Sequence, residues 1–255
     1  MITSTRLLAL TVALTAAAGA QAVTISDTYW GAQPGIDHSS GGPSPYPSFA
    51  NTDVIGESLF DVKSMDVNIV GTNLVVTVNT NFDPSASGAY GTTYGDLLIS
   101  TNGWHPCGSA ASHYGCDNLA TGTTWNFGVS TTGQQLYSLG GGNADVMTSD
   151  AAWGDSHKDG FIYRIGQGTQ LNMNGAGISA VDGAAVTILP GMSITYTIAL
   201  ADLGNFTDLG LSWNMTCAND TIQGDYSVPE PGTMGLLILG LLCMGFVVRH
   251  RKVLA

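Results

Sequence analysis

Apolar and polar residues alternate with a period of two through the middle of the chain. Two segments, 192–200 and 209–217, keep the alternation over nine residues, with Ser, Thr, Asn, Gly or Ala between the apolar positions. A period of two is typical of a β-strand with one face on the core and one face in solvent. The pattern therefore predicts two long, half-buried strands.

Shorter segments repeat this alternation. Residues 65–69 and 74–78 alternate on either side of Gly71-Thr72-Asn73, which predicts a β-hairpin. Further strands are expected over 96–100, 125–129, 135–139, 161–165 and 185–189, with Asp-Gly turns at 159–160 and 182–183. About ten short strands without an amphipathic helix predict an all-β body, either a β-sandwich or a jelly roll.

The N-terminus follows a different pattern. Arg6 precedes a mostly apolar segment over 7–18, and Ala20-Gln21-Ala22 follows it. A basic start, a short apolar stretch and a small-x-small ending are typical of a secretory signal peptide. Residues 1–22 are therefore expected to direct export through the Sec machinery and to be removed by signal peptidase after Ala22.

The C-terminus contains an uncharged apolar segment, residues 232–248, which predicts one transmembrane helix. Its 17 residues are at the short end of the length that spans a bilayer. Arg249, Arg251 and Lys252 follow directly, and such a basic stop favours a cytoplasmic C-terminus with the body outside. A buried core helix is the alternative, and the adjacent basic residues disfavour it.

Val228, Pro229, Glu230 and Pro231 precede this segment. Both prolines favour extended, accessible backbone, as a protease substrate or a stiff linker would need. The motif, the apolar helix and the basic end together closely resemble the PEP-CTERM sorting signal of bacteria that export proteins alongside exopolysaccharide. The resemblance implies anchoring in the inner membrane, then cleavage near 229–231 by an exosortase-type membrane protease and delivery to the cell surface or extracellular matrix.

Between these ends, residues 23–227 are expected to form one domain. Its basic residues are Lys63, Lys158 and Arg164, against 18 acidic ones, which gives a formal charge of −15. Such a surface repels nucleic acid and anionic lipid. Neutral glycans, cations and other proteins remain as partners, although the charge could equally serve solubility alone.

The body contains three cysteines. Cys107 and Cys116 flank a short loop, and an oxidising compartment favours a disulfide between them. Cys217 is expected to be a buried free thiol, with pairing to one of the loop cysteines as the alternative. His105 and His113 lie in the same loop, but their spacing fits no zinc pattern, and an oxidised pair cannot bind the metal.

The carboxylates give weaker signals. Asp150, Asp155 and Asp159 could hold Ca²⁺, but they lack a compact calcium-loop order, and a solvated acidic loop explains them as well. Glu57 is the only Glu in the body, and no Gly-x-Ser-x-Gly motif is present. The sequence therefore predicts a non-catalytic protein without a resident metal or cofactor.

Trp104 and Trp153 lie in segments rich in Asn, Asp and Gly. Their rings could stack on a sugar, or they could pack against the body. The favoured hypothesis is an exported surface or matrix protein associated with exopolysaccharide or biofilm. A carbohydrate-binding module that uses these aromatic residues is the alternative, and an exported glycan hydrolase is the least favoured.

Overall fold

The computed structural model describes residues 22–31, 34–36, 54–55, 58–154 and 162–227, all within one compact unit, Gln21–Val228. The expected signal peptide, the Pro-Glu-Pro motif, the apolar segment over 232–248 and the basic residues after it lie outside these ranges. Among the helices that are described, none has the length and apolar character needed to cross a bilayer.

One sheet contains five antiparallel strands. In spatial order they are β1 (Val23–Ser26), β3 (Val62–Val70), β4 (Asn73–Thr80), β13 (Ser193–Ala199) and β12 (Ala185–Leu189). The predicted hairpin is confirmed as β3–β4, in which Val70 pairs with Asn73 across a two-residue turn. Gly71 has a φ of 63° in that turn, a conformation that glycine adopts at little cost.

A second sheet contains six antiparallel strands. In spatial order they are β11 (Ile178–Gly183), β7 (Gln135–Leu139), β6 (Phe127–Ser130), β5 (Leu97–Ser100), β14 (Asp208–Asn214) and β15 (Thr221–Ser227). Two small sheets pair β8 (Val146–Thr148) with β10 (Gly168–Leu171), and β2 (Pro34–Ile36) with β9 (Ile162–Arg164). The described body is therefore built of several antiparallel sheets, which confirms the all-β prediction.

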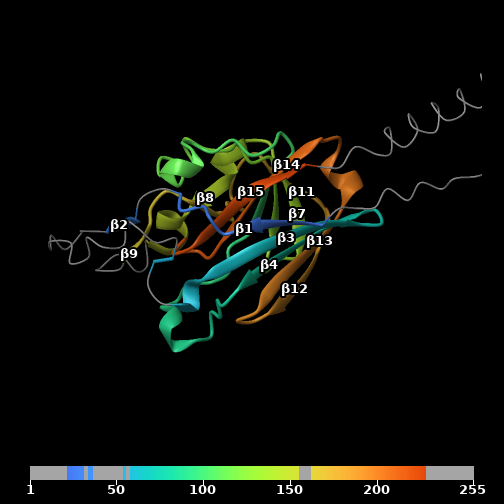
Figure 1. The fold of residues 1–255 in the computed structure, drawn as a ribbon. Helices are drawn as coiled ribbons and strands as arrows, with labels where there is room; N and C mark the ends of the chain where they lie inside the picture. Colours follow the sequence, from blue (N-terminus) through green and yellow to red (C-terminus); the bar gives the residue numbers. More distant parts are fainter. Residues whose placement is uncertain (1–21, 32–33, 37–53, 56–57, 155–161, 228–255) are drawn as a thin grey trace, which may run out of the picture. The chain divides into compact units, whose positions relative to one another are not determined.

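The described helical segments are single turns. They are the 3-10 turns η2 (Ser58–Phe60), η3 (Ser87–Ala89), η4 (Ala110–Ser112), η5 (Gly142–Asp145) and η7 (Leu200–Leu203), and the π-helical turn η6 (Asp150–Gly154). Figure 1 shows them at the ends of strands and in the connections.

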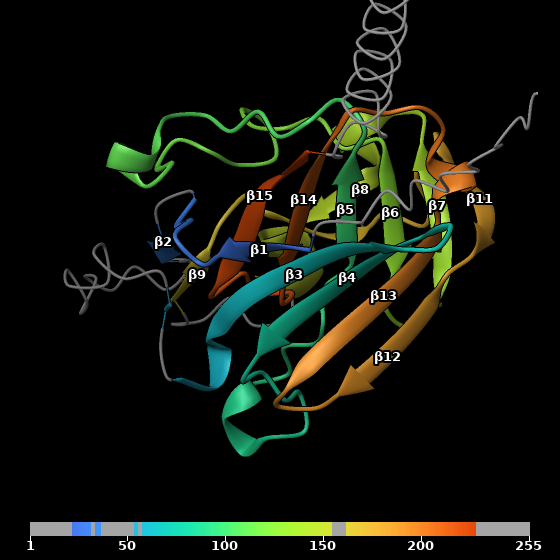
Figure 2. The ribbon, with the colours of Figure 1, turned by 45° about the vertical axis from the view of Figure 1, so that its right-hand side comes forward.

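The inner faces of the two large sheets share one hydrophobic core. Ile194, Tyr196 and Ile198 of β13 point into it, as the alternation over 192–200 predicts. Leu211 and Trp213 of β14 meet them from the other sheet, and both side chains are fully buried. Figure 2 shows β3, β4, β13 and β12 in front of the six-stranded sheet.

The chain joins the two sheets along both sides of this core. On one side β1 lies against β15, where a Cβ atom added to Gly224 would come within 2.5 Å of Ile25 Cγ2. On the other side β11 leads through Ala184 directly into β12, so consecutive strands belong to different sheets. The first strand of the body thus closes one side, whereas on the other side the two sheets are joined by the chain at Ala184.

The half-buried prediction for 209–217 is wrong. Every residue from Leu209 to Asn214 is buried, including Ser212 and Asn214 on the outer face, and the strand ends at Asn214. A second hydrophobic cluster, which includes Trp125, lies against the outside of this sheet and its loops. Because the outer positions of this strand carry Ser and Asn, the sequence pattern predicts a solvent-exposed face where the structure has a covered one.

The sequence also predicted too few strands. In the described part of the chain there are fifteen, and the expectations missed β1, β2, β8, β10, β11 and β15. These strands are short or rich in Gly and polar residues, so they carry no clear alternation. The Asp182-Gly183 turn signal falls at the end of β11, whereas Asp159-Gly160 lies outside the described residues.

Candidate functional site

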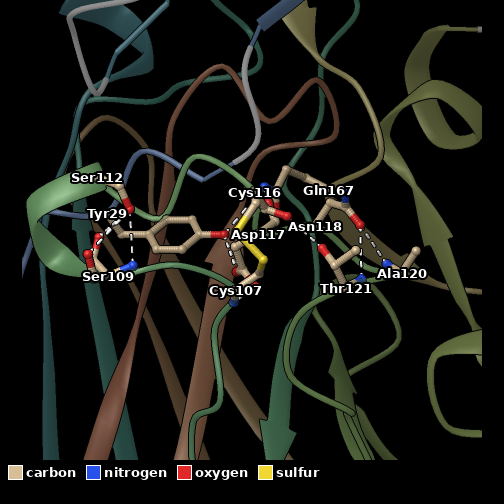
Figure 3. Close-up of a disulfide and its surroundings, with 10 residues drawn as sticks. All are labelled: Tyr29, Cys107, Ser109, Ser112, Cys116, Asp117, Asn118, Ala120, Thr121 and Gln167. Carbon is tan, nitrogen blue, oxygen red and sulfur yellow. Dashed lines mark hydrogen bonds between the residues drawn. A yellow bond between two sulfur atoms is a disulfide. The ribbon is translucent and has the colours of Figure 1, made fainter.

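The predicted disulfide is present. Cys107 and Cys116 are bonded, with 5.3 Å between their Cα atoms, and they close the loop that contains η4 (Figure 3). Cys217 is the free, fully buried thiol that the sequence predicts, and burial raises its pKa to about 12. A thiol held protonated in this way is unreactive.

Asp117 anchors the disulfide loop to the body. Its Oδ1 accepts a hydrogen bond from the Cys107 N–H at 2.8 Å, and its Oδ2 accepts one from the Tyr29 O–H at 2.5 Å. The Gln167 side-chain amide donates to the Asp117 carbonyl oxygen at 2.9 Å. Burial raises the pKa of Asp117, and the hydrogen bonds from the Tyr29 O–H and the Cys107 N–H oppose that rise. Burial beside this carboxylate also raises the pKa of Tyr29.

Aromatic side chains gather around this loop, and we call Tyr29, Trp30, Trp104, His113 and Tyr114 the aromatic loop group. Tyr29 stacks on Tyr114 at 5.6 Å, and the Trp104 ring meets the edge of Tyr114 at 4.9 Å. Trp30 and His113 stack in parallel at 3.7 Å. Tyr29 is buried, whereas the other four side chains keep part of their surface in solvent.

Trp104 is therefore half-buried and held in place. Its indole N–H donates to the Gln223 side-chain oxygen at 3.0 Å, which ties the loop to β15.

The alternative of a zinc site in the loop finds no support, because the two loop sulfur atoms are bonded to each other. The Nε2 atom of His105 lies 2.8 Å from the Asn102 carbonyl oxygen, and His113 is stacked on Trp30.

Of the two alternatives for Trp153, the structure supports packing against the body over stacking on a sugar. Its side chain is 4 % exposed and belongs to the main core, where the ring meets the edge of Tyr163 at 5.2 Å. A ring needs a free face to stack on a sugar, and Trp153 has none. Nothing about its Ala-Ala-Trp-Gly-Asp sequence distinguishes a loop residue on the surface from one that reaches into the core.

The expected calcium ligands are only partly described. Asp150 accepts a hydrogen bond from the Gly166 N–H at 3.1 Å, while Asp155 and Asp159 lie outside the described residues. Asp145 in the same region is buried and accepts hydrogen bonds from the Gly141 and Gly177 N–H groups. Its carboxylate therefore holds two glycine-containing turns together.

A different group of carboxylates lies close together at one end of the body. One carboxylate oxygen from each of Asp27, Asp61 and Asp220 falls within 4.8 Å of the others. Asp220 is fully buried and accepts the Val62 and Thr221 N–H groups, and Asp61 accepts the Asn81 side-chain amide. Carboxylates this close repel one another unless a cation or a proton joins them, and hard cations such as Ca²⁺ take such ligands.

Sequence reasoning did not find this cluster or the full aromatic loop group. Asp61 and Asp220 are 159 positions apart, and Tyr29 reaches Asp117 across 88 positions. No local spacing could reveal either arrangement. The one usable signal was local, namely the loop tryptophan at 104 next to the disulfide.

The C-terminal segment matches a family model. The model describes the PEP-CTERM protein-sorting motif and matches residues 227–252, which include Val228, Pro229, Glu230, Pro231 and the basic residues Arg249, Arg251 and Lys252. No curated protein matches the chain. The match begins at Ser227, the last residue of β15, and so leaves the described body outside it. The chain therefore carries a PEP-CTERM protein-sorting motif at its C-terminus, which implies an exported precursor held in the membrane and processed by an exosortase.

Proposed function

We propose that this protein is a non-catalytic component of the cell surface or extracellular matrix, delivered by exosortase-type processing and associated with exopolysaccharide or biofilm. The sorting motif over 227–252 carries the proposal. The two facing sheets with a shared core support a β-sandwich body that serves as the delivered part.

The position of the motif supports cleavage without damage to the body. β15 ends at Ser227, where it pairs with Asp208 of β14, and the Pro-Glu-Pro sequence starts two residues later. A cut near 229–231 would therefore remove the anchor and leave every ladder hydrogen bond of β15 in place. At the other end β1 begins at Val23, the residue that signal peptidase would expose by cutting after Ala22.

The described carboxylates support a non-catalytic role. Glycoside hydrolysis uses two carboxyl groups that face each other across a cleft. Asp96, Asp117, Asp145 and Asp220 are buried instead, and each accepts backbone N–H groups that hold loops or strand ends. Asp66 bonds to Thr24 and Asn79 on the outer face of the five-stranded sheet.

The sorting step is tested by the intact mass of the protein isolated from its host. We expect a chain that starts at Val23, ends near 229–231 and lacks two hydrogens because of the Cys107–Cys116 bond. Replacing Pro229 and Glu230 by Ala should leave a longer chain in the membrane. Thr233→Ala, inside the matched segment but outside Pro-Glu-Pro, is the matched control and should be processed normally. A wild-type protein that retains 232–255 would overturn the proposal.

The aromatic loop group favours a second candidate function, binding of a neutral glycan. Trp30, Trp104 and Tyr114 are partly exposed. Tyr114 lies in the loop that the disulfide closes and Asp117 holds, Trp104 precedes that loop, and Trp30 stacks on its His113. Rigid aromatic rings beside polar groups stack on sugar rings with little loss of conformational entropy. The body's charge of −15 favours a neutral glycan over an acidic one.

Retention on the producer's own exopolysaccharide tests this candidate. Trp30→Ala and Trp104→Ala should each reduce retention by at least about tenfold, the effect of losing one stacking contact of about 1.4 kcal/mol. Tyr90→Ala removes an exposed aromatic ring elsewhere and should change nothing. Release of sugar products from the same material would favour the hydrolase hypothesis. If all three variants are retained as strongly as the wild-type protein, the glycan role is excluded.

A further inference from the structure

Strand β12 is an open edge of the five-stranded sheet. Among the described residues it pairs with β13 alone, through five consecutive residue pairs without a bulge. Figure 2 shows it at the outer margin of that sheet. Every second residue of such an edge strand directs its N–H and C=O groups away from its neighbour, and this row can pair with another strand.

The other edges of the two large sheets carry features that oppose such pairing. β1 and β15 lie against each other, with Ile25 packed on Gly224. β11 has an irregular register between Ala180 and Gly183, and its sequence contains a charged residue. β12 has neither: its sequence, Ala-Val-Thr-Ile-Leu, contains no charge and no proline. Charges, prolines and bulges are the usual protections of an exposed edge, so β12 is the unprotected one.

The surface next to this edge is also free of charge. Residues 183–201 and 73–82, which include β12, β13 and β4, contain no Asp, Glu, Lys or Arg. The outward positions of these strands carry residues such as Val75, Thr187 and Thr197. Two copies of a body with a charge of −15 repel each other over most of their surfaces. A second copy therefore meets least repulsion at β12.

Exposed apolar side chains flank the same strand. Leu189 at the end of β12 is 50 % exposed, and Met192 in the following turn is 66 % exposed. A strand of five residues that pairs antiparallel with its own copy at full overlap places Thr187 opposite itself and Leu189 opposite Ala185 of the second copy. This pairing would cover Leu189 and satisfy the open backbone groups on both strands.

We propose that β12 pairs with β12 of a second copy of this chain, about a two-fold axis at Thr187, and joins the two five-stranded sheets. The interface is small, so the association is weak in dilute solution. Anchoring in a matrix raises the local concentration of the chains and favours it. Edge pairing of this kind would link the exported bodies to one another without a linking protein.

Cross-linking tests the geometry directly. Thr187→Cys should form a disulfide-linked dimer under mild oxidation, because the two-fold axis brings residue 187 next to its copy. Thr197→Cys on β13 is the matched control: it is also a threonine on the outer face, but its copy lies three strand spacings away, roughly 14 Å, and is displaced further along the strand. That separation exceeds the roughly 7 Å limit for a disulfide. Both variants carry Cys243→Ser, and Cys217 is buried.

A charge introduced at position 187 provides a second test. Self-association of the mature protein from its host is measured by sedimentation at about 0.1–1 mM, where weak dimers are populated. Thr187→Lys and Thr187→Asp should each weaken self-association by up to about fivefold, because like charges meet at the axis. An equal mixture of the two variants should recover the association. Val75→Lys, two strands from the edge, should have no such effect.

The cross-linking and charge experiments together distinguish pairing at β12 from a contact elsewhere. Preferential cross-linking at 187, with rescue in the mixture, supports edge pairing. Equal cross-linking of the two cysteine variants, or a monomeric wild-type protein at 1 mM-scale concentrations, overturns it. Thr187→Lys and Val75→Lys could both lose association while the mixture of Thr187→Lys and Thr187→Asp fails to recover it. That result would place the contact elsewhere and would equally overturn pairing at β12.

Discussion

At the scale of the residue, two buried tyrosines provide a matched comparison. The Tyr196 hydroxyl accepts the Trp213 indole N–H at 2.8 Å and lies 2.7 Å from Thr131 Oγ1. The Tyr226 hydroxyl is equally buried and has no hydrogen-bond partner among the described residues. Both rings belong to the main core, so the two positions differ mainly in the hydroxyl's partners.

We expect Tyr196→Phe to lower the free energy of unfolding by about 1–3 kcal/mol, because it leaves a buried indole N–H without its acceptor. Tyr226→Phe should be neutral or stabilising, because it removes a buried hydroxyl that gains nothing in the folded state. Chemical denaturation of both variants and the wild type measures the difference. Equal destabilisation by the two substitutions would contradict the prediction.

Asp96 should give the folded protein a specific pH dependence. Burial raises its pKa to about 6, although the Thr131 and Leu171 N–H groups both donate to its carboxylate and oppose the rise. The pKa of an unfolded Asp is about 3.9, so between these values the folded protein holds a proton that the unfolded chain has lost. The stability that this proton contributes is fully present below about pH 4 and is lost as the pH rises to about 6.

The corresponding measurement is the free energy of unfolding between pH 4 and 7, with and without Asp96→Asn. The wild-type protein should lose on the order of 2 kcal/mol across this range through Asp96, and the variant should lack that slope. Asp225→Asn, at an exposed position, controls for the loss of one negative charge. A slope in Asp96→Asn that equals the wild-type slope would assign the titration to another group, whereas the raised pKa of Asp117 explains a smaller remaining slope.

The residue scale also shows what alternation can and cannot predict. It placed Tyr196 and Trp213 correctly on inward faces, because the side-chain period of a strand is two. It could not predict that their polar atoms would bond to each other, since the two residues come from different sheets. The partner of a polar atom depends on how the sheets pack, which the local pattern does not contain.

At the scale of the element, the disulfide loop should depend on its covalent bond. The loop between Cys107 and Cys116 contains one 3-10 turn, and the body holds it mainly at Asp117 and through the aromatic loop group. Closing so short a loop stabilises the folded state by roughly 2–3 kcal/mol in the chain-entropy account.

Replacing both Cys107 and Cys116 by Ser should therefore lower the thermal midpoint by several degrees. Reductant should lower the midpoint of the wild-type protein in the same way and leave the double variant unchanged. Differential scanning calorimetry in both conditions measures this. A reductant effect on the double variant would mean that another group is responsible, and an unchanged midpoint would show that Asp117 and the aromatic loop group hold the loop without the disulfide.

Elements differed in how well the sequence predicted them. β12 and β7 have the predicted bounds, because apolar and aromatic residues are concentrated in both short segments. β14 was predicted as a strand, but its outer face was assigned to solvent. A second layer, which contains β8, β10 and loop residues and has its own hydrophobic cluster, covers that face, and the residues of that cluster come from distant parts of the chain. Burial of a polar face is a property of the packing and not of the strand.

At the scale of the whole molecule, the dominant property is the imbalance of charge. Three basic residues oppose 18 acidic ones over 23–227, so the folded body repels itself. The Debye length falls from about 30 Å at 0.01 M salt to about 8 Å at 0.15 M. Screening should therefore stabilise the compact state.

We expect the midpoint of thermal unfolding to rise when sodium chloride increases from about 0.01 to 0.15 M, the range over which screening becomes effective. Choline chloride at the same ionic strength is the control and should give the same rise, because screening does not depend on the identity of the cation. A rise that sodium chloride produces and choline chloride does not would indicate binding of the cation instead.

The sequence by itself determined that this protein carries a sorting motif and that its body is all-β. The sorting motif and the disulfide loop are contiguous or nearly so in the chain, and the all-β class follows from a period of two, so each could be recognised locally. The tertiary structure alone decided that Trp153 is core, that β14 is covered and that Asp27, Asp61 and Asp220 meet. Those arrangements join residues up to 193 positions apart, as Asp27 and Asp220 are, or depend on one sheet packing on another, and local spacing carries no information about such contacts.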